Sequence, residues 1–333
     1  MATCTEAIDF GPTVGIKSIV QFSGGAFHNA CLQANSKVDD STGLRIHSGA
    51  HVAIRFLLKY PLLVSNQRIC ELGCGTGVYG LVGTRGGSLS SHLTLTDGNA
   101  ETVNLALKNV QLLASTSSES KISCRKLLWG SMDAVDELFH YYKLPKETSK
   151  KPYLSDHPSN HDEVDTPFSR ETHHYDVVIG CELFYYRTNI EELLFTVIEL
   201  TRSDGIFVHS HVFRRIGQDL ELIKYLQGHN WVTYEIPVEH FIDQEELDEH
   251  PEWYHVHCLV SGSIDRMNAL LEGKIEAPTF VEKIHDSSIK SKWTLFTGLN
   301  TVSTQATVSE GESTDAAEGL DSGFLIGNLF SSR

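Results

Sequence analysis

The chain has 333 residues, and its 27 lysines and arginines against 43 aspartates and glutamates give a formal net charge of −16. That length suits one α/β domain with appendages. The acidic balance argues against a protein that binds nucleic acid without regard to sequence, because such binding needs a basic surface. An acidic surface would favour a basic protein substrate, but it is also an ordinary means of staying in solution.

The seven cysteines are scattered, and no spacing among them resembles a zinc site or a disulfide framework. Cys70, Cys124, Cys181 and Cys258 stand in apolar runs, where a free cysteine behaves as a small hydrophobic residue. The N-terminus lacks a secretory signal, and no apolar run approaches the length of a membrane span. We therefore expect a cytoplasmic protein, with the nucleus as an additional location and no membrane partner.

In chain order, residues 1–40 form an N-terminal extension in which residues 19–22 are predicted as a short edge strand. A helix is predicted over residues 51–59, with apolar side chains on one face, and Pro61 ends it.

Strands and helices then alternate. The predicted strands are 69–72, 93–96, 121–128, 175–180, 205–210, 231–236 and 254–260. The predicted helices between them are 78–84, 100–113, 133–142, 190–201 and 218–226. This alternation predicts an α/β, Rossmann-like, doubly wound fold, with a mostly parallel seven-stranded sheet and helices on both faces.

Composition divides the chain further. The main domain is predicted over residues 41–262, and within it residues 145–173 are polar and charged, which indicates a solvated, mobile insertion. Residues 263–299 are predicted as a C-terminal extension, with an added strand or packed segment at 291–296. Residues 300–333 form a tail rich in Ser, Thr, Glu and Gly over most of its length, and it is predicted to be disordered.

Residues 68–80 read Arg-Ile-Cys-Glu-Leu-Gly-Cys-Gly-Thr-Gly-Val-Tyr-Gly, which is a short strand, a glycine turn and the start of a helix. Gly73, Gly75 and Gly77 permit positive φ and let a ligand lie against bare backbone. The helix that follows offers free N–H groups and the positive end of its dipole. This turn is predicted to bind a nucleotide-like ligand.

Asp97 ends the next predicted strand, where an acid can accept hydrogen bonds from both ribose hydroxyls. A Rossmann dehydrogenase would show Gly-x-Gly-x-x-Gly, whereas here the third glycine comes one residue early and Glu71 precedes the turn. Ligands of open α/β sheets bind outside the carboxyl ends of the strands. The glycine turn, Asp97, Trp129 and the segment Cys181–Tyr185 all fall at such ends, so we predict one site there.

The segment Glu71–Gly77 with Asp97 resembles the first two motifs of class I, seven-strand S-adenosylmethionine methyltransferases. Glu182-Leu-Phe-Tyr185 resembles the acidic-x-x-aromatic motif of the seven-strand protein lysine methyltransferases, also called methyltransferase family sixteen, which includes calmodulin-lysine and chaperone-lysine methyltransferases. Three further segments look like that family: Thr42-Gly43 with its following helix, Leu95–Asn99 and Leu127–Trp129. The resemblance spans residues 40–215, apart from the insertion.

The resemblance implies S-adenosyl-L-methionine as the cofactor. The residues it assigns to cofactor binding are His47, Glu71, Gly73, Cys74, Gly75, Gly77, Asp97, Trp129 and Cys181. Two of them depart from the family pattern, since His47 replaces its usual tryptophan and Cys181 its frequent alanine. Trp129 is placed beside the adenine, and the alternative is an ordinary core tryptophan.

Glu182 and Tyr185 are the predicted catalytic residues. The implied reaction is attack of a neutral amine on a sulfonium methyl group, with Glu182 holding and orienting the amine and the ring of Tyr185 facing the cation. The alternative for Glu182 is an acid that complements a helix dipole. No metal is predicted, because the pairs His209/His211 and His255/His257 lack a third ligand nearby.

The favoured function is transfer of a methyl group to a lysine side chain of a protein, by a monomer. A methyltransferase of small amines or of RNA is the first alternative, although the acidic balance argues against nucleic acid. A cofactor-binding protein that acts by interaction alone is the second.

Overall fold

The computed structural model describes residues 3–10, 15–22, 43, 46–114, 121–141, 174–185, 188–212, 218–271 and 294–295. The first of the two units into which the chain divides is Met1–Gly298, and every described residue belongs to it. The predicted insertion at 145–173 and the predicted tail at 300–333 lie outside the described residues.

An eight-stranded sheet forms the centre of the first unit, in the order β10-β8-β9-β7-β6-β3-β4-β5. Its strands are β3 (Arg68–Leu72), β4 (His92–Asp97), β5 (Ile122–Lys126), β6 (Tyr175–Cys181), β7 (Thr201–Val212), β8 (Trp231–Glu235), β9 (Val256–Ser263) and β10 (Thr294–Leu295). Strands β5, β4, β3, β6 and β7 run parallel, while β9 is antiparallel to both of its neighbours. The seven predicted strands are confirmed, and β10 adds a short edge strand within residues 291–296.

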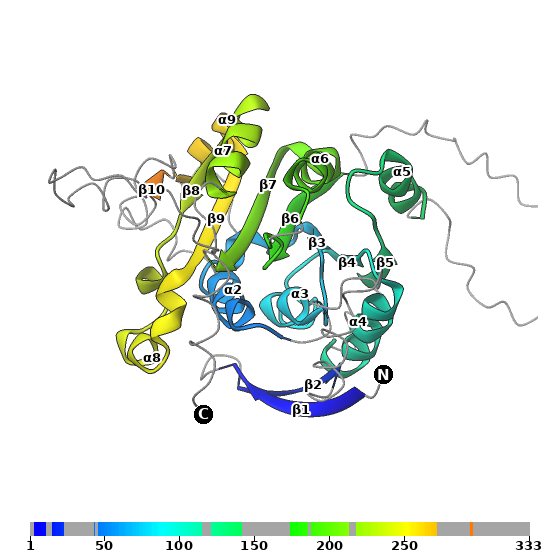
Figure 1. Ribbon diagram of the computed structural model, residues 1–333, viewed down its shortest axis with the longest axis vertical. Helices are drawn as coiled ribbons and strands as arrows, with labels where there is room; N and C mark the ends of the chain where they lie inside the picture. Colours follow the sequence, from blue (N-terminus) through cyan, green and yellow to red (C-terminus); the bar gives the residue numbers. More distant parts are fainter. Residues whose placement is uncertain are drawn as a thin grey trace, which may run out of the picture. The chain divides into compact units, whose positions relative to one another are not determined.

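Helices cover both faces of the sheet (Figure 1). They are α2 (Ser48–Lys59), α3 (Val78–Gly83), α4 (Ala100–Leu113), α5 (Met132–Tyr141), α6 (Ile190–Leu200), α7 (Gln218–Gly228) and α9 (Ile264–Leu271). Successive strand residues point to opposite faces. Ile69 therefore joins the core under α2, α3 and α4, whereas Cys70 joins the core under α5, α6 and α7. None of the described helices is long and apolar enough to cross a membrane.

The N-terminal extension contains a two-stranded antiparallel ribbon of β1 (Thr3–Asp9) and β2 (Ile16–Phe22). Residues 19–22 are thus a strand, as predicted, but they pair with β1 and not with an edge of the main sheet. The ribbon is attached through the buried Asn109 of α4, whose side chain accepts from the Val20 N–H at 2.8 Å and donates to the Val20 carbonyl at 3.0 Å. Asn109 also donates to the Thr76 carbonyl at 2.9 Å, which ties the ribbon to the glycine turn.

The connection between β8 and β9 was not predicted to contain helices. It holds the 3-10 turns η5 (Val238–His240) and η6 (Pro251–His255) and the short helix α8 (Gln244–Glu249), so the strand predicted from 254 begins at 256. This connection packs along α2. The ring of Phe241 meets Phe56 edge-on at 5.3 Å, and the Arg55 guanidinium lies 4.7 Å from the centre of the Trp253 ring.

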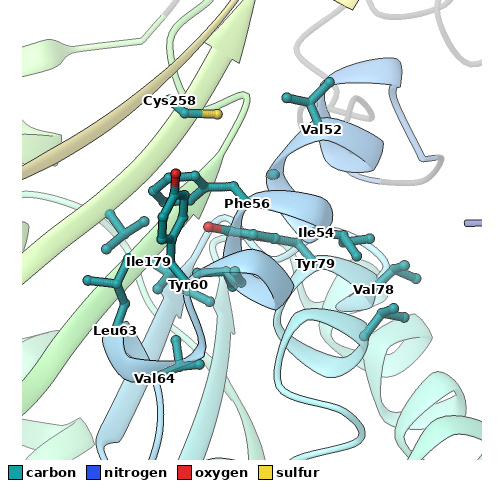
Figure 2. Close-up of a cluster of buried hydrophobic side chains, with 14 of the residues drawn as sticks. Val52, Ile54, Phe56, Tyr60, Leu63, Val64, Val78, Tyr79, Ile179 and Cys258 are labelled. Atoms are coloured by element: carbon teal, nitrogen blue, oxygen red, sulfur yellow. The ribbon is translucent and has the colours of Figure 1, made fainter. Parts of the chain in front are cut away.

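The core between α2, α3 and the sheet contains a tyrosine whose hydroxyl lacks a partner. Figure 2 shows Tyr79 of α3 among Phe56, Tyr60 and Ile179, with its hydroxyl pointing into this cluster. Tyr79 is 3% exposed, and its hydroxyl makes no hydrogen bond to any residue that the structure describes. Burial without a partner disfavours the folded state.

Replacing Tyr79→Phe should therefore leave the free energy of unfolding unchanged or raise it by about 1 kcal/mol, because an unpaired hydroxyl is removed. Tyr175→Phe is the matched control. The Tyr175 hydroxyl is equally buried but donates to Thr94 Oγ1 at 3.1 Å, so its loss should lower stability by about 1 kcal/mol. Urea unfolding measures both variants, and an equal loss in the two would contradict this difference.

Candidate active site

A cavity of about 510 Å³ lies at the carboxyl ends of β3, β4, β5 and β6. That volume is within the range of small-molecule sites, and the location is the one where open α/β sheets bind ligands. The cavity is lined by His47, Glu71, Gly73, Cys74, Gly75, Asp97, Trp129, Cys181, Glu182 and Tyr185, among others. Of the predicted site residues, Gly77 alone does not line it.

The glycine turn forms one wall. Gly73 and Gly75 have φ of 54° and 55°, in the left-handed region that favours glycine. A Cβ atom at Gly73 would lie 2.7 Å from Leu183 Cδ2, and one at Gly75 would lie 2.8 Å from the Gly43 carbonyl oxygen. Neither position has room for a side chain, so the wall is bare backbone at these two glycines.

Gly77 serves packing instead. It precedes α3 with φ of 74°, and a Cβ atom there would lie 3.0 Å from Leu95 Cδ1 and 3.2 Å from Ala106 Cβ. Its lack of a side chain lets α3 approach β4 and α4. Gly77 thus lies behind the residues that line the cavity.

Asp97, the last residue of β4, faces the cavity and also forms a hydrogen bond with the glycine turn. Its Oδ2 accepts the Gly75 N–H at 3.1 Å, and its Oδ1 accepts the Asn99 N–H at 2.9 Å. An ionised carboxylate can accept about four hydrogen bonds and donates none, which is what ribose hydroxyls require of a partner. Asp97 therefore fits a ribose at this position.

Glu71 lies behind the turn and is 1% exposed. Its Oε2 accepts the Gly80 N–H at 3.0 Å. Burial, helped by the nearby charge of Asp97 and opposed by the hydrogen bond from Gly80, raises the pKa of this carboxyl group to about 8. In the free protein Glu71 is therefore mostly protonated at neutral pH, and its side chain acts as a neutral part of the cavity wall.

The segment after β5 forms the next wall. Leu128 is 54% exposed although it is large and apolar, and the half-buried Trp129 lies against the turn, 3.3 Å from the place of a Cβ at Gly73. The Gly130 N–H donates to Thr196 Oγ1 on α6 at 2.8 Å, which fixes this segment. Trp129 borders the cavity, and Leu128 offers it an apolar surface that was not predicted.

Glu182 follows β6 and has φ of 57°, which is uncommon for a residue other than glycine. Its backbone N–H donates to the Ser210 carbonyl at 2.8 Å, and its Oε1 accepts the Val212 N–H at 3.0 Å. The carboxylate lies against Gly49, where a Cβ atom would collide with it. Glu182 therefore borders the cavity and also stands at the N-terminal turn of α2, where the helix dipole favours negative charge.

Tyr185 lines the same end of the cavity. Thr188, which was not singled out from the sequence, holds the backbone around it. Its hydroxyl donates to the Leu183 carbonyl at 2.6 Å and accepts the Tyr185 N–H at 3.2 Å. A threonine three residues after an aromatic is too common a pattern to reveal such a role.

His47 precedes α2 with extended backbone and borders the cavity. Cys74 and Cys181 border it as well, and burial raises the pKa of both thiols well above the usual value. Since the reactive form of cysteine is the thiolate, these two residues contribute surface and not nucleophiles.

The paired histidines lie outside the cavity lining. His209, His211 and His257 stack in a row, with ring centres 5.3 Å and 5.7 Å apart, and His255 belongs to η6. Stacked rings do not aim their nitrogens at one point. Within the described ranges, no group of three or more His, Cys, Asp or Glu side chains could hold a metal ion.

The raised pKa of Glu71 gives a pH-dependent prediction. Between about 4.5 and about 8 the unfolded chain has released a proton that folded Glu71 keeps, so stability from this group falls as pH rises. Glu71→Gln keeps an acceptor for Gly80 but has no proton to lose.

The stability of this variant relative to the original protein should increase with pH across that window, by at most about 1.4 kcal/mol per pH unit. Urea unfolding at several pH values measures the difference in stability between the variant and the original protein. The contributions of other titrating groups are common to both proteins and cancel in this difference. Parallel stability profiles for the two proteins would show that Glu71 ionises normally.

A sequence model of the lysine methyltransferase family matches residues 26–142. The match covers the glycine turn, Asp97 and Trp129 but ends before Glu182 and Tyr185. No curated protein is significantly similar to the chain in sequence.

Solved structures with a similar fold include three proteins described as methyltransferases. A Streptococcus mutans protein described as S-adenosylmethionine-dependent has 12% identity and a TM-score of 0.42, and the match covers 74% of this chain and 53% of that one. A second, in complex with S-adenosylhomocysteine, has 11% identity and a TM-score of 0.39, with coverage of 65% and 50%. The third, from Pyrococcus horikoshii and described as acting on RNA, has 12% identity and a TM-score of 0.40, with coverage of 72% and 96%.

The chain thus spans about half the length of the first structures that it matches. The fold is defined by the strand order of the chain itself, in which the parallel strands β5, β4, β3, β6 and β7 are followed across the sheet by the antiparallel β9. That order, with the glycine turn at the end of the first parallel strand, is the fold of class I S-adenosylmethionine methyltransferases, and residues 26–142 match the sequence model of the lysine methyltransferase family.

Proposed function

We propose that the chain transfers a methyl group from S-adenosylmethionine to the side-chain amine of a lysine in a protein substrate. The observation that carries this proposal is a single cavity with two chemically different ends. One end has the glycine turn, Asp97 and Trp129, which suit a nucleoside, and the other has Glu182 and Tyr185, which suit a cation.

The cavity fits the cofactor by its chemistry. Bare backbone at Gly73 and Gly75 allows close approach, the carboxylate of Asp97 accepts ribose hydroxyls, and Leu128 and Trp129 offer apolar surface to a base. Bound there, the cofactor supplies an electrophilic methyl group on a good leaving group. The residues of the chain are then required chiefly to position the acceptor and exclude water.

Glu182 is suited to position the acceptor amine. Its backbone is held by Ser210 and its carboxylate by Val212, so the side chain has little freedom to move. A carboxylate in that place accepts a hydrogen bond from the incoming amine and keeps its lone pair directed at the methyl group. The ring of Tyr185 stabilises the ammonium that enters, which releases one proton to solvent before the neutral amine attacks, and the methylated ammonium that forms on transfer.

The charge of the chain supports a basic protein as substrate. Residues 239–252, in the connection between β8 and β9, contain seven acidic residues and no lysine or arginine. The pairing of Val212 with Val256 places the start of β9 beside the end of β7, whose Val212 holds Glu182. A basic segment that presents a lysine to Glu182 would therefore approach an acidic surface.

Every described cysteine is a free thiol, which supports a reducing compartment. The proposal therefore places the protein in the cytoplasm or nucleus. It also includes a monomeric state.

The cofactor end is tested by Asp97→Ala. Loss of two charge-assisted hydrogen bonds to ribose should weaken binding of S-adenosylhomocysteine by about 2–4 kcal/mol, or roughly 30-fold to 1000-fold. Asp176→Ala is the control, because Asp176 also accepts a backbone N–H, that of Arg68 at 2.7 Å, but lies at the start of β6, away from the cavity. Calorimetry should show unchanged affinity in the control, and unchanged affinity in Asp97→Ala would remove Asp97 from the cofactor site.

The acceptor end is tested by Glu182→Gln, which keeps an acceptor for Val212 but removes the charge. Turnover should fall by about 100-fold or more while affinity for S-adenosylhomocysteine stays within a few-fold, because the interaction is with the acceptor. Full turnover would return Glu182 to the alternative of a helix-end acid, and loss of cofactor affinity would place it at the cofactor.

Tyr185 should act through its ring face and not its hydroxyl. Tyr185→Phe should therefore retain most of the turnover and Tyr185→Ala should lose most of it, because phenylalanine keeps the surface that faces the cation. Equal losses in the two variants would show that the hydroxyl is the working group.

A further inference from the structure

One wall of the cavity is formed by the chain just before α2. Gly43, Ile46 and His47 line the cavity there, and we call these three residues the wall before α2. Gly43 lies directly on the glycine turn, because a Cβ atom there would come within 3.1 Å of Gly75 Cα and 3.4 Å of Asp97 Oδ2. The width of the cavity at this place therefore depends on how firmly the wall before α2 is held.

The N-terminal ribbon holds this wall through one buried amide. Gln21 of β2 is 3% exposed, and its Oε1 accepts the Ile46 N–H at 3.3 Å. Its Nε2 donates to Glu6 Oε2 on the neighbouring strand β1 at 2.5 Å. Because an ionised carboxylate only accepts, Glu6 fixes the amide with its nitrogen toward β1 and its oxygen toward Ile46. The backbone of Ile46 is thus held by a residue 25 positions earlier in the chain.

The adjacent residue of β2 is connected to a different wall. Val20 exchanges two hydrogen bonds with the side chain of Asn109, which also donates to the Thr76 carbonyl in the glycine turn. Thr76 lines the cavity as well. Two successive residues of β2 are therefore linked to the glycine turn and to the wall before α2, and the ribbon sets the spacing between them.

We infer that the ribbon is a working part of the cofactor site and that Gln21 is its positioning residue. Gln21 does not line the cavity, so it acts through Ile46. A wall that is already in place loses less freedom when a ligand binds, which raises affinity. The ribbon precedes residues 26–142, the segment that the family model matches. This inference rests on the proposed function, since it requires the cofactor to occupy the cavity.

The test measures binding of S-adenosylhomocysteine by calorimetry on the full chain. Gln21→Met keeps the length of the side chain but removes both polar atoms, so affinity should fall by about 5-fold to 10-fold. In the double variant Glu6→Gln/Gln21→Glu the amide and the carboxylate exchange places. The carboxylate at position 21 still accepts the Ile46 N–H, so affinity should stay within about 2-fold of the original.

Thr233→Ala is the control for stability. The Thr233 hydroxyl is buried and forms a hydrogen bond with Ser261 Oγ at 2.9 Å, between β8 and β9 and outside the cavity lining. Its loss should lower the melting temperature and leave the affinity for S-adenosylhomocysteine unchanged.

Unchanged affinity in Gln21→Met, or an equal loss in the double variant, would overturn the inference and leave the cofactor site standing. An equal loss in Thr233→Ala would also overturn it, because affinity would then follow overall stability. If Gln21→Met does not fold, Gln21→Asn decides, since its shorter amide cannot reach both Glu6 and Ile46; unchanged affinity there would contradict the inference. Failure of the original protein to bind S-adenosylhomocysteine would instead overturn the proposed function together with this inference.

Discussion

The candidate site is built on a backbone turn that has no room for a side chain at Gly73 or Gly75. Gly73 and Gly75 are both left-handed, and the first is packed against Leu183 while the second is packed against Gly43. The segments that supply the rest of the cavity thus contact the turn directly. A side chain at Gly73 or Gly75 would push these segments apart and narrow the cavity.

Three side chains form hydrogen bonds with backbone groups of the turn and of the helix start that follows it. Asp97 accepts the Gly75 N–H, Asn109 donates to the Thr76 carbonyl, and Glu71 accepts the Gly80 N–H at the start of α3. Two of these side chains are fully buried, where an unmade hydrogen bond is expensive. The result is a preorganised backbone surface, which lowers the entropy that a bound nucleoside would otherwise lose.

The other end of the cavity depends on a different constraint. Glu182 adopts an uncommon left-handed conformation, and the end of β7 and the N-terminal turn of α2 hold it there. Backbone strain of this kind persists only when the surroundings enforce it, and it is concentrated at functional sites. The sheet joins the two ends, because β3 and β6 are neighbours and their carboxyl ends open into the same cavity.

Much of this arrangement could be predicted from local sequence. The buried strands appear as continuous apolar runs, and the rule that ligands bind at carboxyl ends gathers Asp97, Trp129 and Glu182 at one place. The hairpin of β1 and β2 could not be predicted, because its alternation is weak and its attachment depends on Asn109, which lies far along the chain. Glu192, in the first turn of α6, also lines the cavity and was not predicted, since an acid at the start of a helix has an ordinary explanation.

The most direct test of the account is to follow the methyl group itself. The full chain would be incubated with methyl-labelled S-adenosylmethionine and a cell lysate, and the protein fraction would be hydrolysed to amino acids. The account predicts label in protein, recovered as methyl-lysine. Label recovered in RNA, in a small molecule or in another amino acid would contradict the account of the acceptor end, and the absence of any transferred label would contradict the proposed activity as a whole.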